Sequence, residues 1–135
     1  MRRRQQRCKP PDEVLAALAE FFGAQVNQVE VAEYSWFARL HGSVRATTRR
    51  RRIYLRGSAA DFFRDPLLVL HEYFHVLRQW EPRVLTVRAY VWEWLRRGYA
   101  DNRFELEARE FAEDHHYRFR ALLSRRAQPS SASRV

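Results

Sequence analysis

The chain has 135 residues, of which 46% are hydrophobic and 14% aromatic, enough to build one compact core. It carries 25 basic and 16 acidic residues, a formal net charge of +9, and every basic residue except Lys9 is arginine. Cys8 is the only cysteine, which excludes an internal disulfide and a zinc site built from cysteines. No stretch approaches the roughly 18 apolar residues that a membrane span needs, so none is expected.

The two ends of the chain predict tails on either side of one folded domain. We expect a basic tail over residues 1–10, a domain over 11–126 and a disordered polar tail over 127–135. The basic start imitates a signal peptide, but Asp12, Glu13 and Glu20 interrupt the apolar stretch that follows. We therefore expect a cytoplasmic protein, although export by a dedicated secretion or injection machine would leave no mark of this kind.

The first half of the domain predicts a helix followed by short antiparallel strands. The expected elements are a helix over 12–22, a strand over 29–32, a helical turn over 35–41, and strands over 44–48 and 53–56. Gly23 is suited to end the helix. The run from Arg49 to Arg52 joins the last two strands into a hairpin, without the Gly or Asn that a tight turn favours.

The second half predicts three helices and thereby an α+β fold. Asp65 and Pro66 form a helix start, and that helix should run through Trp80. A second helix spans residues 84–97, with apolar residues on two sides, so we expect both sides to pack. The last helix opens at Asp101 and Asn102 and continues to about residue 126.

The first of these three helices carries the motif H-E-x-x-H, from His71 to His75. Histidines four residues apart lie one helical turn from each other, so both imidazoles can bind one metal ion. Glu72 lies beside the pair and can hold a water molecule without binding the metal itself. The alternative is that both histidines merely pack.

A catalytic zinc needs a third protein ligand, and no third histidine follows the motif at a suitable spacing. The last helix offers carboxylates instead, and Glu105 lies about 65° from the centre of its apolar stripe, against about 95° for Glu107. Glu105 is therefore the acid nearest the core. In an alternative interpretation, Glu105 completes a capping box with Asn102 and is not a ligand.

These residues carry a family resemblance. H-E-x-x-H followed by E-x-E-A-x-x-F-A, over residues 105–112, resembles the gluzincin-type zinc peptidases, including the ImmA/IrrE-like peptidases. Residues 21–80 are similar to the metallopeptidase core domain associated with extracellular contractile injection systems. The resemblance implies a small zincin-like domain, a zinc ion held by His71, His75 and Glu105, and peptide hydrolysis. Arg109 departs from it, because many gluzincins have an acidic residue there.

If the site is active, Glu72 serves as the general base for a zinc-activated water molecule. The stretch Ile53-Tyr54-Leu55 could form the rim of the cleft and pair with an extended peptide, or could be an ordinary edge strand. Tyr90 or Tyr99 could stabilise the transition state, or could simply be buried.

Two other functions compete with that of a peptidase acting on a peptide or protein substrate. The protein could hold zinc as a weakly active or inactive binding or assembly module, or it could be a basic nucleic-acid binder. No recognised nucleic-acid-binding signature supports the last, so no specific nucleic acid is expected as a partner. The arginine clusters at 2–4 and 49–52 are either a solvated surface or a docking surface for an acidic protein partner.

Overall fold

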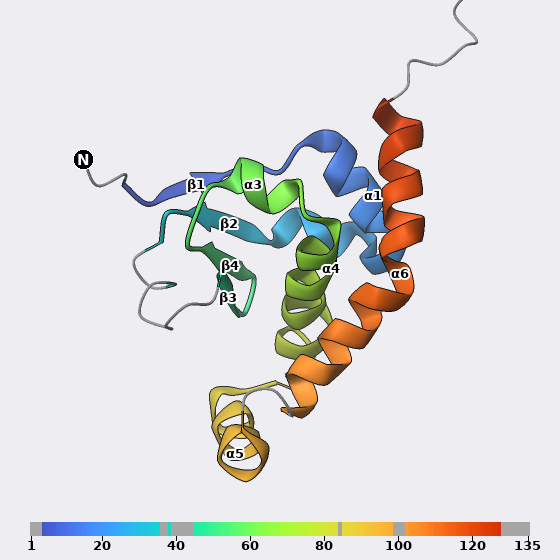
Figure 1. The fold of residues 1–135 in the computed structure, drawn as a ribbon. Helices are drawn as coiled ribbons and strands as arrows, with labels where there is room; N and C mark the ends of the chain where they lie inside the picture. Colours follow the sequence, from blue (N-terminus) through green and yellow to red (C-terminus); the bar gives the residue numbers. More distant parts are fainter. Residues whose placement is uncertain (1–3, 36–37, 39–44, 84, 99–101, 128–135) are drawn as a thin grey trace, which may run out of the picture.

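The computed structural model describes residues 4–35, 38, 45–83, 85–98 and 102–127. In chain order the elements are β1 (Gln6–Cys8), α1 (Asp12–Phe22), η1 (Gly23–Gln28), β2 (Glu30–Glu33), β3 (Ala46–Arg49), β4 (Arg52–Leu55), α3 (Ala59–Phe63), α4 (Pro66–Phe74), η2 (His75–Trp80), α5 (Val87–Arg97) and α6 (Arg103–Ala127). The fold is α+β, as the sequence predicts. Helix α4 lies between the sheet and the long helix α6, and α5 extends from the end of this body (Figure 1).

The four strands form a mixed sheet in the order β1-β2-β4-β3. Strand β2 pairs in parallel with β4, whereas β1–β2 and β3–β4 are antiparallel, so the expectation of antiparallel strands is only partly correct. Strand β4 occupies the interior of the sheet, and its Ile53 and Leu55 are almost completely buried. Among the described residues, β3 forms one edge of the sheet and β1 the other.

The N-terminal segment corrects one expected boundary. Residues 6–8 do not belong to a tail, because Gln6, Arg7 and Cys8 pair with Glu33, Ala32 and Val31 of β2. The pairing of an edge strand uses backbone groups, so mostly exposed side chains such as these do not reveal it in the sequence. The next element is as predicted: α1 covers residues 12–22, with acidic residues in its first turn and Gly23 after its end.

The arginine hairpin forms without a glycine. Residues 50 and 51 make the turn between β3 and β4, and Arg51 adopts a positive φ of 61°, a conformation that glycine or asparagine would adopt more easily. The Arg51 side chain also pairs with Glu81, at 3.1 Å. This contact from the end of η2 holds the turn from outside. The helical turn expected over 35–41 lies mostly outside the described residues.

Helices α4 and η2 together form the continuous helix predicted over 66–80. The Asp65 side chain caps it by accepting a hydrogen bond from the Leu68 backbone N–H at 3.2 Å, and Pro66 occupies the first turn. From His75 onward the helix widens into a π-helix, and the Glu81 N–H donates to the Val76 carbonyl five residues earlier. The widened segment begins at His75, the last residue of the H-E-x-x-H motif, and continues to Trp80.

The core lies where α1, α4 and α6 meet the inner face of the sheet. Its members are almost completely buried apolar side chains from all four of these elements, among them Leu18, Val31, Ile53, Val69, Leu70, Tyr73 and Phe119. The apolar stripe of α6 is buried as predicted, with Phe104, Ala108 and Ala112 inside. Among the described residues, no helix is both long and apolar enough to cross a membrane.

Helix α5 contradicts the expectation that both its sides pack. It begins at the predicted region, with Thr86 as its N-cap and Gly98 after its end. Yet Trp92 is 62% exposed and Leu95 67% exposed, and Glu93 is the buried residue of this helix. Apolar periodicity alone could not indicate that, within the described part of the chain, these positions stay exposed.

Candidate metal centre

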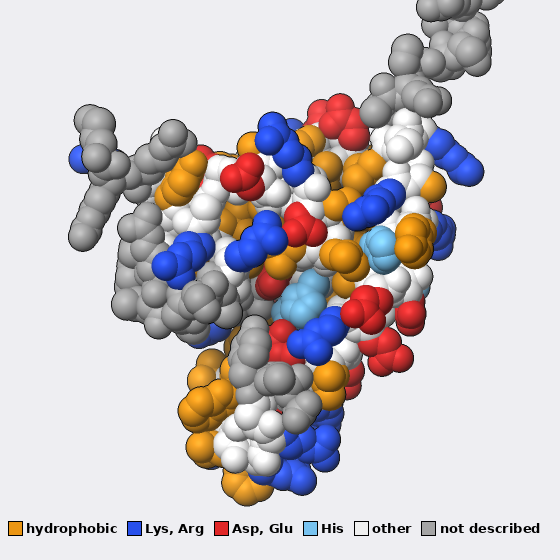
Figure 2. All heavy atoms as spheres, in the orientation of Figure 1, with side chains coloured by type: hydrophobic (Ala, Val, Ile, Leu, Met, Phe, Trp, Pro, Cys, Tyr) orange, Lys and Arg blue, Asp and Glu red, His pale blue; other side chains and the backbone are white. Residues whose placement is uncertain are grey.

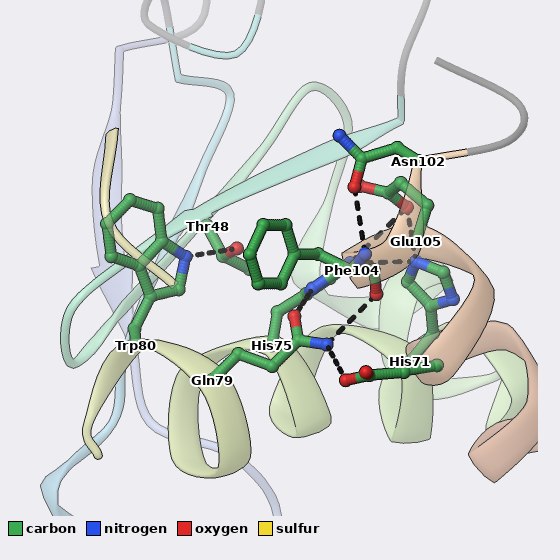
Figure 3. Close-up of polar contacts among 9 residues, drawn as sticks. Thr48, His71, His75, Gln79, Trp80, Asn102, Phe104 and Glu105 are labelled. Atoms are coloured by element: carbon green, nitrogen blue, oxygen red, sulfur yellow. Dashed lines mark hydrogen bonds and ion pairs between the residues drawn. The ribbon is translucent and has the colours of Figure 1, made fainter. Parts of the chain in front are cut away.

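His71, His75 and Glu105 meet at one point between α4, η2 and α6. Glu105 lies 34 residues after His71 and 30 residues after His75 in the chain. The Nε2 atoms of the two histidines lie 3.1 Å apart, and Oε2 of Glu105 lies 3.1 Å from His71 Nε2 and 3.3 Å from His75 Nε2. Figure 3 shows the three side chains converging. This group could hold a metal ion, and we call it the candidate metal centre.

Gln79 determines which nitrogen of His75 faces the centre. The Gln79 amide nitrogen donates to the Phe104 carbonyl at 3.0 Å and to the Glu107 carboxylate at 3.2 Å. Both partners are acceptors, so the amide oxygen must be the atom that lies 2.6 Å from Nδ1 of His75. Nδ1 therefore carries a proton, so in the neutral ring Nε2 is the nitrogen whose lone pair is available to a metal ion at the centre. This is the arrangement of a metal-binding histidine.

The capping interpretation of Glu105 is not the arrangement found. The Asn102 side chain caps α6 by accepting a hydrogen bond from the Phe104 N–H at 2.8 Å. The carboxylate of Glu105 lies instead against the two histidines, and its side chain is only 9% exposed. Asn102 therefore caps the helix, and Glu105, three residues later, contributes its carboxylate to the centre (Figure 3).

The electrostatics of the three groups are strongly coupled. Burial raises the pKa of Glu105, but hydrogen bonds and positive charge from His71 and His75 outweigh it and hold the pKa far below the usual range of a carboxyl group. Burial lowers the pKa of His75, but the hydrogen bond and charge of Glu105 raise it to a net value above normal. The centre thus favours a carboxylate paired with positive charge, whether that charge is a proton or a metal ion.

Glu72 lies between two cavities that meet at the centre. One, of about 360 Å³, is also bordered by His75, Glu105 and Tyr90; the other, of about 410 Å³, is bordered by His71, Glu105 and Arg109. Burial raises the pKa of Glu72, in spite of the nearby histidines that lower it. Glu72 therefore borders both cavities together with residues of the candidate metal centre, and its role as general base stays a prediction.

The remaining predicted site residues have different outcomes. Tyr90 of α5 is half-buried and borders the first cavity together with His75 and Glu105, so it is not sealed in the core. Tyr99 lies outside the described residues. The prediction of a role for either tyrosine in the transition state stays a prediction.

The expected rim strand is corrected. Ile53, Tyr54 and Leu55 belong to β4, which pairs with β2 on one side and β3 on the other, so it is neither the rim nor an edge strand and cannot accept a further strand. The strand at the cleft is β3, whose Ala46, Thr47, Thr48 and Arg49 border the first cavity. The sequence pattern predicts the hairpin but does not indicate which of its two strands lies at the edge of the sheet.

Two functional positions were missed by sequence analysis. Gln79 follows His75 by four residues, the same spacing that links the two histidines, so one-turn periodicity was a usable signal. Trp80 borders the cleft, and its indole N–H donates to the Thr48 hydroxyl at 3.2 Å, which ties η2 to β3 (Figure 3). No motif marks that contact.

The arginine run at 49–52 is engaged within the protein. Arg50 and Arg51 pair with Glu81, Arg52 pairs with Glu30 at 3.4 Å, and Arg49 stacks over the Trp80 ring at 5.6 Å. These partners offset part of the positive charge of the hairpin. Any acidic partner would have to compete with them, although the arginine side chains remain about half exposed.

Comparisons with known proteins identify no relative: no family model, no curated protein and no solved structure matches this chain. The function therefore has to be inferred from the geometry of the centre and the chemistry of its residues.

Proposed function

We propose that the protein is a zinc-dependent metallopeptidase in which His71, His75 and Glu105 hold the metal and Glu72 is the general base. The observation that carries the proposal is the triangle of donor atoms, with sides of 3.1, 3.1 and 3.3 Å. Donor atoms bound to a tetrahedral zinc at about 2.0–2.1 Å would lie about 3.3–3.4 Å apart. The three atoms are thus already close to the spacing that zinc requires.

The chemistry of the donors also fits zinc. Two imidazole nitrogens and one carboxylate oxygen are a donor set common in catalytic zinc sites, with three protein ligands and one position left for water. The hydrogen bond from His75 Nδ1 to Gln79 fixes the ring so that Nε2 can bind the ion. Glu107, on the other side of Gln79, extends this support to a second carboxylate.

The bound zinc ion would supply a Lewis acid, which lowers the pKa of water from 15.7 to about 7 and polarises a peptide carbonyl. Glu72 removes the proton from the attacking water molecule and transfers it to the leaving amine. Its raised pKa suits both steps, because a buried carboxylate binds a proton more readily than an exposed one. The cavities on both sides of Glu72 allow an extended chain to cross the centre.

Tyr90 is the best candidate to stabilise the negative charge that develops on the carbonyl oxygen. Its phenol can donate a hydrogen bond, and the residue borders the same cavity as Glu72 and His75. Its role would be apparent as a loss of kcat with little change in KM in Tyr90→Phe.

The test begins with metal content. Elemental analysis of protein purified without added metal should find about one zinc per chain. Glu105→Gln should reduce zinc affinity by orders of magnitude, whereas the matched variant Glu107→Gln, two residues along the same helix, should reduce it far less. Negligible zinc and no uptake on titration would remove the proposal.

Activity is tested separately with Glu72→Gln, which should retain zinc and lose cleavage of a quenched-peptide mixture. His71→Ala should lose both zinc and cleavage, because it removes a ligand. If the wild-type protein holds zinc but cleaves nothing in the mixture, the protein is a zinc-containing binding module and not a peptidase.

A further inference from the structure

Helix α5 carries an unusual concentration of exposed apolar side chains. Of the large hydrophobic residues that are exposed in the described part of the chain, five lie on this one helix: Val87, Val91, Trp92, Trp94 and Leu95. Figure 2 shows hydrophobic side chains gathered over α5, at the lower left of the view. An exposed apolar patch of this kind usually marks an interaction site or a ligand-binding groove.

Three of these five residues border a cavity that the candidate metal centre also borders. Val87, Val91 and Trp94 border the cavity of about 360 Å³ that also contains Glu72, His75 and Glu105. Trp80 and Leu85 continue the apolar lining toward the centre. The other two, Trp92 and Leu95, lie on α5 but do not border the cavity. The apolar surface of α5 is thus continuous with the candidate site along one side only.

The opposite wall of this cavity is the edge strand β3. The Arg56 N–H donates to the Arg45 carbonyl at 2.9 Å, and ladder bonds alternate along an antiparallel pair, so the backbone groups of Ala46 and Thr48 point away from β4. The Thr48 carbonyl already accepts a hydrogen bond from the Arg49 side chain. Ala46, which borders both cavities, is the position where an extended chain can pair with the sheet.

We propose that α5 is the specificity-determining wall of the substrate cleft and selects extended polypeptide segments with a bulky aromatic or aliphatic side chain next to the cleaved bond. The inference rests on the proposed peptidase function. Val91 and Trp94 contact the selected side chain, while β3 aligns the backbone and Glu72 lies at the bond. The occupant of the patch is a substrate chain because the apolar wall and the centre border one cavity.

Peptides that differ at one position test the selection. The probes are internally quenched peptides of one sequence that carry Phe, Leu, Ala or Asp on the α5 side of the cleaved bond. The zinc-loaded wild-type protein should cleave the Phe and Leu peptides with kcat/KM at least about tenfold higher than the Ala peptide, the scale at which apolar pockets discriminate. The Asp peptide should be cleaved more slowly still.

Two tryptophans of the same helix supply the variant and its control. Trp94→Ala should reduce the ratio of Phe to Ala cleavage to within a few fold, whereas Trp92→Ala, also exposed but outside the cavity, should leave the ratio unchanged. Val91→Asp is a second variant. It should make the peptides with apolar side chains poorer substrates than the others. Circular dichroism verifies that each variant is folded.

The outcomes separate this inference from the proposed function. Cleavage without preference for Phe or Leu would overturn the inference and leave the peptidase intact. If nothing is cleaved, binding of the Phe peptide to zinc-loaded Glu72→Gln, lost in the Trp94→Ala background but retained with Trp92→Ala, would still support an apolar peptide groove. Binding of both variants can also be measured with anionic phosphatidylglycerol vesicles. If Trp92→Ala and Trp94→Ala weaken binding of the peptide or of the vesicles equally, α5 is a general docking surface and the inference is overturned.

Discussion

Helices α6 and α5 are both amphipathic, but their apolar side chains have opposite environments. In α6, Phe104, Ala108 and Phe119 are almost completely buried, and the helix as a whole packs against α4 and α1. In α5, Trp92 and Trp94 are more than half exposed, and the helix extends from the main body (Figure 1). The two patterns look alike in the sequence, and only one of them is part of the core.

The difference shows what each region contributes. Helix α6 supplies Glu105, and its burial fixes that carboxylate against two histidines of another helix. Helix α5 supplies Tyr90 and an apolar wall to the cleft, and a wall that receives a substrate has to remain accessible. A rigid helix thus positions the proposed chemistry, and an exposed helix is suited to recognition.

The largest expected effect is on the free energy of unfolding, which should depend on α6 far more than on α5. Phe119→Ala should reduce the free energy of unfolding by about 3–5 kcal/mol, because it removes a buried ring that packs against Phe21. Trp92→Ala in α5 should change it by less than about 0.5 kcal/mol, as for other exposed positions. Urea denaturation of the two variants beside the wild-type protein measures both values. A comparable loss in Trp92→Ala would mean that α5 packs against a partner surface in solution.

Several elements of the fold were predictable because local signals agreed with the tertiary structure. Asp65 and Pro66 mark the start of α4, and Gly23 marks the end of α1. Strand β1 was not predictable, since its pairing uses backbone groups and its side chains are mostly exposed. Arg51 adopts a positive φ against its own preference, held by a residue 30 positions away. Such a contact leaves no trace in the local sequence.

The centre itself was largely predictable, and its surroundings were not. One-turn spacing brought His71 and His75 together, and the helical stripe of α6 selected Glu105 over Glu107. The cleft depends on which strand is at the sheet edge and on where α5 lies. Both follow from tertiary packing, so the sequence could offer Ile53-Tyr54-Leu55 as a rim or an edge strand but could not indicate that β3 borders the cleft.

The second prediction concerns Gln79, which joins the two sides of the centre. Its amide oxygen accepts a hydrogen bond from His75 Nδ1, and its amide nitrogen donates one to the Phe104 carbonyl of α6. The residue is 1% exposed. Gln79→Leu should weaken zinc affinity about 10–100-fold, the usual effect of removing a residue that orients a ligand. Competition with a chromophoric chelator measures the affinity.

A control separates orientation from general damage. Glu107→Gln removes the charge of an exposed partner of Gln79 and leaves the His75 contact intact, so zinc affinity should change little. In Gln79→Leu, nitrogen NMR of the metal-free protein should also detect a mixed population of His75 tautomers. Wild-type affinity together with a single tautomer would show that Gln79 is only a packing residue.

The smallest expected effect concerns Glu81, which ties the arginine hairpin beside the cleft to the end of η2. Its hydrogen bond with Arg51 lowers the pKa of the carboxyl group below its usual value. A group with a depressed pKa in the folded protein stabilises it above the pKa of the unfolded chain, and this contribution is lost as the pH falls through the folded pKa. The difference in unfolding midpoint between the wild-type protein and Glu81→Gln should therefore be present at neutral pH, decrease as the pH falls below about 4.3, the usual pKa of Glu, and disappear in stronger acid. Since the pair is near the surface, added salt should also reduce the difference at neutral pH. Denaturation of both proteins across this pH range, at low and high salt, provides the measurement, and a difference that persists in acid would mean that Glu81 acts through packing and not through its charge.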